Sequence, residues 1–150
     1  MRGGKWTTAK GAAGILQYLD VRSLQRVLLP FGPRGAATDA RVTELEEQIG
    51  VPFATVAAAC DSADAVRGAV TAAARLADVP SLGAVMVVSA EHDVVAAAAA
   101  AGMRTTCVRR SSPNNWKAAH AAQHEVPRVV DLQLIIEELN GVSFRRSALR

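Results

Sequence analysis

The stretch that decides the fold is residues 83–108, which read GAVMVVSAEHDVVAAAAAAGMRTTCV. Residues 83–89 form a continuously apolar run, as expected for a central parallel strand that is covered on both faces. The alanine-rich run over 91–101 predicts a helix that ends at Gly102, and residues 104–108 resume as a strand. This strand-helix-strand unit predicts an α/β domain built on parallel strands.

The same alternation continues on both sides of this unit. Toward the N-terminus the pattern predicts a helix over 9–20, a strand over 26–30, a helix over 39–48 that ends before Gly50, a strand over 53–59, and a helix from about 62 with Val66, Ala69, Val70, Ala73 and Leu76 on its buried face. Toward the C-terminus it predicts a short strand at 129–130 and a helix that Asp131 caps and Gly141 closes. Right-handed crossovers then give a three-layer, doubly wound, mostly parallel sheet, with no separate cap domain.

Two segments of the decisive stretch resemble a known family. Residues 86–94 (MVVSAEHDV) and 101–105 (AGMRT) resemble the fourth motif region of the haloacid dehalogenase superfamily, which runs strand, Gly-Asp-x-x-x-Asp, alanine-rich helix, Ala-Gly-Met, strand. The resemblance is specific around 84–108 and looser over the rest of 10–140. It implies a Rossmann-like core and phosphoryl chemistry that uses an aspartate nucleophile, a Ser/Thr, a Lys and acidic residues that hold Mg²⁺.

The motifs that this chemistry requires are mostly missing. No Asp-x-Asp lies near the N-terminus, Leu29-Pro30 stands where a Ser or Thr ends the second strand, and Cys60-Asp61-Ser62 stands where the Lys is expected. Val88-Ser89 replaces the Gly-Asp pair, which leaves Asp93 alone. One carboxylate cannot both hold Mg²⁺ and attack phosphorus, so the sequence predicts a degenerate member without catalytic residues or cofactor. Ser89, His92 and Asp93 remain as vestigial candidates.

The family's first strand is also absent from the sequence. In the family it lies between the strands that correspond to 84–88 and 26–30, so its neighbours must pair directly or another segment must fill the position. Residues 4–8 (GKWTT) are short and polar for that purpose. We therefore expect a partner chain to donate a strand by main-chain hydrogen bonding.

Composition sets limits on the class of protein. No apolar run approaches the roughly 20 residues of a membrane span. The two cysteines, Cys60 and Cys107, lie in apolar stretches and are typical of small buried side chains rather than a disulfide framework. The first nineteen residues carry three cations and no acid, which weakly resembles a mitochondrial targeting segment. The predicted location is intracellular, either mitochondrial or cytoplasmic.

Charge is uneven along the chain. Residues 104–150 carry eight Lys/Arg against four Asp/Glu, whereas residues 1–103 carry nine against ten. The densest pairs are Arg109-Arg110 and Arg145-Arg146, which together with Trp116 are the candidate partner-binding residues, for protein or for RNA. A solvated basic face without a partner explains the Arg pairs equally well. Packing over the sheet edge explains Trp116 equally well.

Two other constellations have weaker support. His120 and His124 would share a face if both lay on one helix, as in zinc sites, although an exposed polar helix accounts for them better. Residues 32–35 (GPRG) follow a strand and are typical of a turn rather than of an anion-binding loop.

Three functional interpretations follow from the sequence. The chain would have an N-terminal extension over 1–8, one domain over 9–140 and a basic tail over 141–150. The favoured interpretation is a non-catalytic structural or interaction subunit of a protein or ribonucleoprotein assembly. The alternatives are a phosphatase-type hydrolase, which would need Mg²⁺ and a site completed by another chain or by non-standard residues, and a small-ligand-binding domain.

Overall fold

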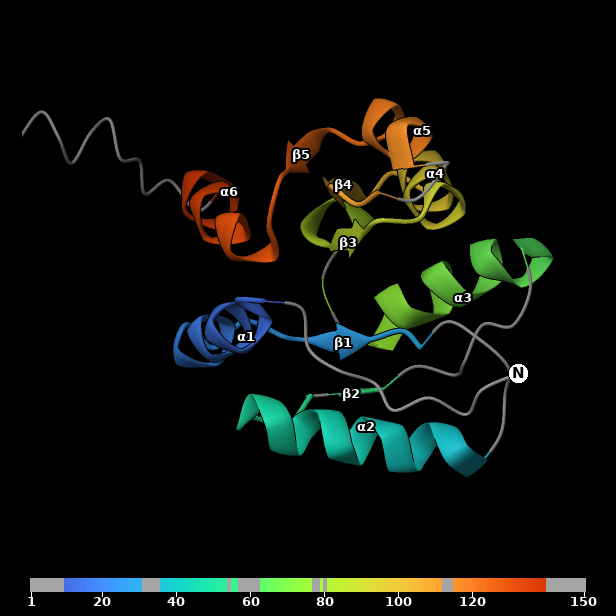
Figure 1. The fold of residues 1–150 in the computed structure, drawn as a ribbon. Coiled ribbons are helices and arrows are strands. Elements are labelled where there is room, and N and C mark those ends of the chain that lie inside the picture. Colours follow the sequence, from blue (N-terminus) through green and yellow to red (C-terminus); the bar gives the residue numbers. More distant parts are fainter. Residues whose placement is uncertain are drawn as a thin grey trace, which may run out of the picture.

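The computed structural model describes residues 10–30, 36–53, 55–56, 63–76, 79, 81–111 and 115–139. Helices and strands alternate along this part of the chain (Figure 1). The helices are α1 (Ala12–Val21), α2 (Ala36–Ile49), α3 (Ala63–Leu76), α4 (His92–Ala100), α5 (Asn115–Ala121) and α6 (Leu132–Leu139), with short 3₁₀ turns η1 (Leu82–Ala84) and η2 (Val129–Asp131). The strands are β1 (Val27–Leu28), β2 (Thr55–Val56), β3 (Met86–Ser89), β4 (Arg104–Val108) and β5 (His124–Val126).

Every described strand pairing is parallel, which confirms the predicted α/β class. The pairings form two pieces, a two-stranded sheet β1-β2 and a three-stranded sheet β3-β4-β5. Within the larger piece Val87 lies opposite Thr105, and Cys107 lies opposite Glu125. In Figure 1 the strands follow one another from β2 through β1, β3 and β4 to β5, and none of the described residues pairs β1 with β3.

Helices cover both faces of the strands, as a doubly wound fold requires. On one face Val66 and Val70 of α3 pack with Val94 and Ala98 of α4, and α5 joins this layer where Ala118 meets Val95 and Cys107. On the other face Ile15 of α1 packs with Val126 and Leu132, and α2 lies against α1. The order of the strands reverses between β2 and β3. The crossover that contains α2 therefore runs along the sheet in one direction, and the crossovers that contain α4 and α5 run in the other.

The alanines of α4 allow the close packing of this layer. Val95, Ala98, Cys107 and Ala118 are fully buried. Gly102 follows α4 with φ of 89°, so the helix ends as predicted, at a glycine in the left-handed conformation. None of the described helices is long and apolar enough to cross a membrane.

The last predicted strand is wrong. Val129 and Val130 lie in η2, which the Arg128–Asp131 ion pair (3.1 Å) spans, and the fifth strand is His124–Val126 instead. This strand binds β4 at its end through Arg109 N and Val126 O, 2.9 Å apart. It buries only Val126, so it presented no apolar run in the sequence.

Two further predictions fail in detail. Leu76 was expected on the buried face of α3, yet it is 46% exposed, and Ala74 is buried in its place. Val66, Val70 and Ala74 lie four residues apart and form the buried ridge, which turns away from Leu76. Residues 83–84 belong to η1 rather than to the strand, which begins at Met86.

Candidate functional site

The carboxyl ends of β3 and β4 form the edge where doubly wound folds bind ligands. Ser89, at the end of β3, is partly buried, and its Oγ accepts a hydrogen bond from the main-chain N–H of Glu91 at 3.0 Å. Glu91 is the N-cap of α4 without a side-chain capping bond. The Ser89 hydroxyl therefore serves the turn into α4.

His92 and Asp93 lie in the first turn of α4. His92 Nδ1 is 3.4 Å from Asp93 Oδ1, and the two side chains are 38% and 59% exposed. An exposed pair of this kind contributes about 1 kcal/mol or less. In the part of the chain that the structure describes, no three His, Cys, Asp or Glu side chains gather as metal ligands would.

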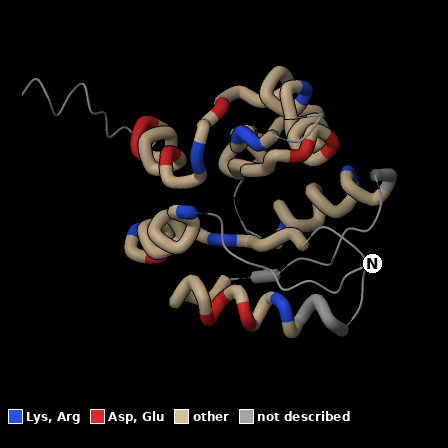
Figure 2. The backbone as a smooth tube through the Cα atoms, viewed as in Figure 1, with Lys and Arg blue, Asp and Glu red and all other residues tan. Residues whose placement is uncertain are grey.

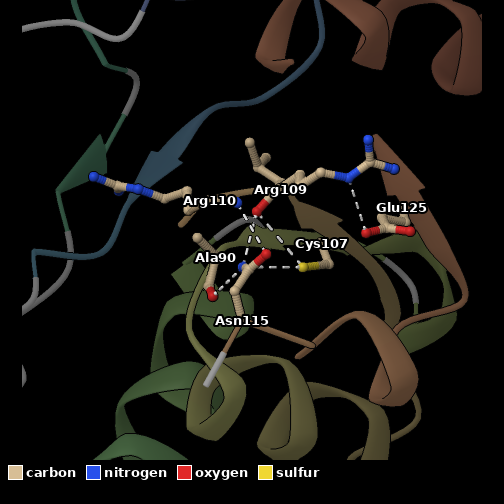
Figure 3. Close-up of polar contacts among 7 residues, drawn as sticks. Ala90, Cys107, Arg109, Arg110, Asn115 and Glu125 are labelled. Carbon is tan, nitrogen blue, oxygen red and sulfur yellow. Dashed lines mark hydrogen bonds and ion pairs between the residues drawn. The ribbon is translucent and has the colours of Figure 1, made fainter. Parts of the chain in front are cut away.

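Asn115 is the best-connected polar side chain at this edge (Figure 3). Its Nδ2 donates to the main-chain oxygens of Ala90 at 2.9 Å and Val108 at 3.1 Å. Its Oδ1 accepts from the N–H of Arg110 at 2.9 Å. Asn115 is 5% exposed and thus holds the ends of β3 and β4 and the start of α5 together. We did not single it out from the sequence, although an Asn at the start of a helix is a capping signal.

Cys107 lies beneath Asn115, whose Nδ2 is 3.6 Å from its Sγ. The thiol is fully buried, as predicted. Burial raises the pKa of Cys107, an effect that the hydrogen bond from Asn115 partly opposes. A neutral, inaccessible thiol is a core side chain and no nucleophile. Cys60 lies outside the described residues.

The basic pair beside this edge is partly neutralised. Arg109 Nε is 3.4 Å from Glu125 Oε2, whereas Arg110 is exposed next to it. In Figure 2 acidic residues lie at the start of α4 and in β5, and the basic residue of α5 is Lys117. Arg145 and Arg146 lie outside the described residues, as do residues 32–35, so the C-terminal part of the basic surface stays a prediction.

Trp116 is 60% exposed on α5, so it does not pack into the sheet edge. Lys117 Nζ lies 5.6 Å from the centre of its ring, and His120 meets the ring edge-on with centres 6.0 Å apart. His124 belongs to β5, so His120 and His124 do not share a helix face and the zinc-pair geometry is absent.

The second feature of interest is the β1–β3 break, by which we mean the facing edges of β1 and β3 that do not pair with each other in the described residues. Val85 O accepts from Arg104 N at 2.9 Å, so residues 85, 87 and 89 direct their main-chain groups toward β4. Because main-chain groups alternate along a strand, those of Met86 and Val88 face the break. Val88 is 41% exposed, an unusual value for a residue so far inside the order of strands.

Arg26 lies directly before β1. Its side chain is 9% exposed and is 3.1 Å from Asp20, and its Nη2 also donates to Pro52 O at 3.0 Å. Its Nε is buried without a hydrogen-bond partner among the described residues. Arg26 therefore ties α1 to the segment before β2.

The comparisons with known proteins bear on the fold. No protein-family model matches the chain, and no curated protein sequence matches it. Among solved structures, the crystal structure of an L-2-haloacid dehalogenase superposes with a TM-score of 0.51 at 20% sequence identity, over 66% of this chain and 46% of that one. The chain thus spans less than half the length of that enzyme. The likeness shows the fold alone, an α/β fold that the aligned part of this chain shares with that enzyme.

Proposed function

We propose that this chain is a non-catalytic, dehalogenase-like interaction subunit whose sheet is completed by another protein chain. The observation that carries the proposal is the β1–β3 break, at which the described strands stay in two separate parallel sheets. An unpaired strand edge offers main-chain donors and acceptors to an added strand.

The break offers main-chain groups for pairing. Met86 and Val88 present two N–H and two C=O groups to it. Each hydrogen bond that an added strand makes to these groups contributes about 0.5–1.5 kcal/mol. A domain whose net stability is only about 5–15 kcal/mol gains substantially when another strand pairs with these groups.

The polar residues at the carboxyl edge support the non-catalytic side of the proposal. The Ser89 hydroxyl serves a turn, and Asp93 is an exposed carboxylate paired with its neighbour. Asn115 uses its amide for main-chain bonds. The described part of the edge offers structural contacts and solvated polar pairs in place of a nucleophile with its base.

The hydrolase alternative rests on the same break. A strand from another chain could bring a nucleophile beside Ser89 and Asp93, and the solved neighbour is an L-2-haloacid dehalogenase. The chain with Mg²⁺ is expected to hydrolyse neither para-nitrophenyl phosphate nor an L-2-chloro acid above the rate without protein. Activity that is lost in Asp93→Asn would favour the hydrolase over the interaction subunit.

The first test of the proposal is the mass of residues 1–150 by light scattering over a hundredfold range of concentration, together with a thermal melt. We expect the mass to grow with concentration, because free strand edges pair with one another. A monomer at every concentration, with a sharp cooperative melt, would show that the sheet needs no other chain.

The partner surface is proposed to extend to Trp116 and Arg110 on the exposed side of α5. An exposed Trp beside cations fits a protein hot spot, and it also fits single-stranded RNA, whose bases stack on the ring while its phosphates meet the cations. A fluorescent single-stranded RNA of mixed sequence distinguishes them. Binding that weakens steeply with salt and is lost in Trp116→Ala and Arg110→Ala would place the chain in a ribonucleoprotein.

A further inference from the structure

We infer that the exposed side of α5 binds an unpaired stretch of RNA without regard to its sequence, with one base stacked on Trp116 and the adjacent phosphates held by Arg110 and Lys117. The inference rests on the part of the proposed function that assigns a partner to this surface, and it chooses RNA over protein as that partner. It does not depend on the β1–β3 break.

Helix α5 presents Trp116 from a fixed position. Asn115 and Ala118 lie on the buried side of the helix, at 5% and 0% exposure. Residues four apart share a helix face, so Trp116 and His120 lie together on the side away from Ala118, and both are exposed. The ring therefore projects to solvent from a helix that is anchored in the core.

The neighbours of the ring orient it without covering it. His120 meets the ring edge-on with centres 6.0 Å apart, and Lys117 Nζ lies 5.6 Å from its centre. Both neighbours are exposed side chains, and Trp116 itself is 60% exposed. A base that stacks on the ring displaces only the flexible side chain of Lys117, which then turns to a phosphate.

The surroundings of Trp116 favour RNA over a protein partner. Among the described residues of β4, α5 and β5, Trp116 is the only large apolar side chain that is exposed, and its exposed neighbours are Lys117 and His120. The core of a protein interface is an apolar patch that is depleted in charge. A lone aromatic ring among cations matches a single strand of RNA, which offers a base face and a phosphate in every nucleotide.

The segment that carries this surface is basic. Residues 104–128 contain five Lys or Arg and one acid, Glu125. Glu125 lies 3.4 Å from Arg109, and in Figure 3 the side chain of Arg110 points away from this pair. None of the described acids forms an ion pair with Arg110 or Lys117. These two cations are therefore available to phosphates.

Asn115 holds the cation of β4 beside the ring of α5. Its Oδ1 accepts a hydrogen bond from the N–H of Arg110 at 2.9 Å, and Trp116 is the next residue along the chain (Figure 3). Its Nδ2 donates to Ala90 O, so the exposed carboxylate of Glu91 borders the same surface. Because that carboxylate repels phosphates, Glu91→Gln should raise the affinity for RNA.

The strand has to be unpaired because stacking on Trp116 requires a free base face. In a duplex the faces of the bases are already stacked on their neighbours. Stacking also accepts every base, since each has a π face, so the surface reads no sequence. The contrast between single-stranded and double-stranded RNA is therefore the sharpest test of the inference.

The test uses the full chain with Trp6→Phe, in which Trp116 is the remaining tryptophan. The probe is a fluorescein-labelled RNA of about twelve nucleotides and mixed sequence. Its matched controls are the same RNA annealed to its complement and a labelled peptide of equal length made of Glu. We expect the single strand to bind at least tenfold more tightly than either control. The unlabelled single strand should quench the fluorescence of Trp116 over the same range of concentration.

Variants of exposed residues separate stacking from charge. Trp116→Ala should weaken single-strand binding about tenfold and leave its salt dependence unchanged, whereas Trp116→Phe should retain most of the affinity. Arg110→Gln and Lys117→Gln should each lower the slope of log K against log salt concentration by about 0.7. Arg75→Gln, which removes an exposed cation from the last turn of α3, should change neither quantity.

The other outcomes overturn the inference. Equal binding of the single strand and the duplex would mean that charge alone attracts RNA, and tighter binding of the Glu peptide would assign the surface to a protein. Unchanged affinity in Trp116→Ala would remove the ring from the site. If no probe binds, the inference is wrong, and the concentration dependence of the mass still tests separately whether another chain pairs at the break.

Discussion

Asn115, the first residue of α5, donates a hydrogen bond from Nδ2 to the main-chain oxygen of Ala90, which follows β3, over 2.9 Å. The same nitrogen donates to Val108 O at the end of β4. One buried amide therefore joins the ends of two neighbouring strands to the helix that leaves the second (Figure 3).

Replacing Asn115 tests this role. Asn115→Ala leaves Ala90 O, Val108 O and Arg110 N without their partner and should cost about 1–3 kcal/mol, a fall of several degrees in Tm at fixed protein concentration. Asn115→Asp should cost more at pH 7, because its carboxylate faces two main-chain oxygens. We expect burial beside two main-chain oxygens to raise the pKa of this carboxylate, so Asn115→Asp should regain stability as the pH falls. Equal Tm values for Asn115→Ala and the unaltered chain would show that the contact is unimportant.

Two glycines with positive φ should respond differently to alanine. Gly102 has φ of 89° with nothing within 4 Å of an added Cβ, so Gly102→Ala should cost only the backbone strain, about 1 kcal/mol. Gly11 has φ of 86°, and its added Cβ would lie 3.0 Å from Val130 Cβ.

Gly11→Ala should therefore melt at a lower temperature than Gly102→Ala. In the double variant, Val130→Ala leaves its own Cβ in place and removes only the methyl groups beyond it, so it should recover only part of the loss by easing the repositioning of η2. Equal Tm values for the two single glycine variants would contradict the close approach of Val130 to Gly11.

The Cys107 thiol gives a pH prediction. Burial raises its pKa above the ordinary 9.0, so the folded chain keeps this proton at pH values where the unfolded chain releases it. Its contribution to stability is therefore complete below about pH 8 and is lost as the pH rises through the raised pKa. In a Cys60→Ser background, a thiol reagent at pH 8 should label Cys107 only at the rate at which the chain unfolds. Rapid labelling under native conditions would contradict its burial.

The sequence predicted the elements around residues 86–108 well because local signals agreed there. The apolar strand, the alanine helix and Gly102 each point to the same structure, and β4 was placed at its observed residues. β5 could not be predicted, because three residues with one buried side chain give no periodic signal, and its existence depends on pairing with β4. The adjacent Val129-Val130 pair has the β-branched residues typical of a strand, but it forms the turn η2 that leads into α6.

The candidate site residues stay predictions. The sequence identified Ser89, His92 and Asp93, of which Ser89 ends β3 and the other two lie in the first turn of α4. The role of Asn115 required the long-range contacts to Ala90 and Val108, which no local pattern reveals. Of the two expectations for the strands beside the absent one, direct pairing of β1 with β3 is not found among the described residues, and the filling of the position by another segment stays a prediction.

The most direct test of the central claim is amide hydrogen exchange along β3, resolved to single residues, in the full chain at a concentration where light scattering shows a monomer. The account predicts slow exchange at Val87 and Ser89, which face β4, and exchange at least tenfold faster at Met86 and Val88, which face the break. Slow exchange at all four amides in the monomer would mean that the break is already filled, and would contradict both the open sheet and the need for a partner strand.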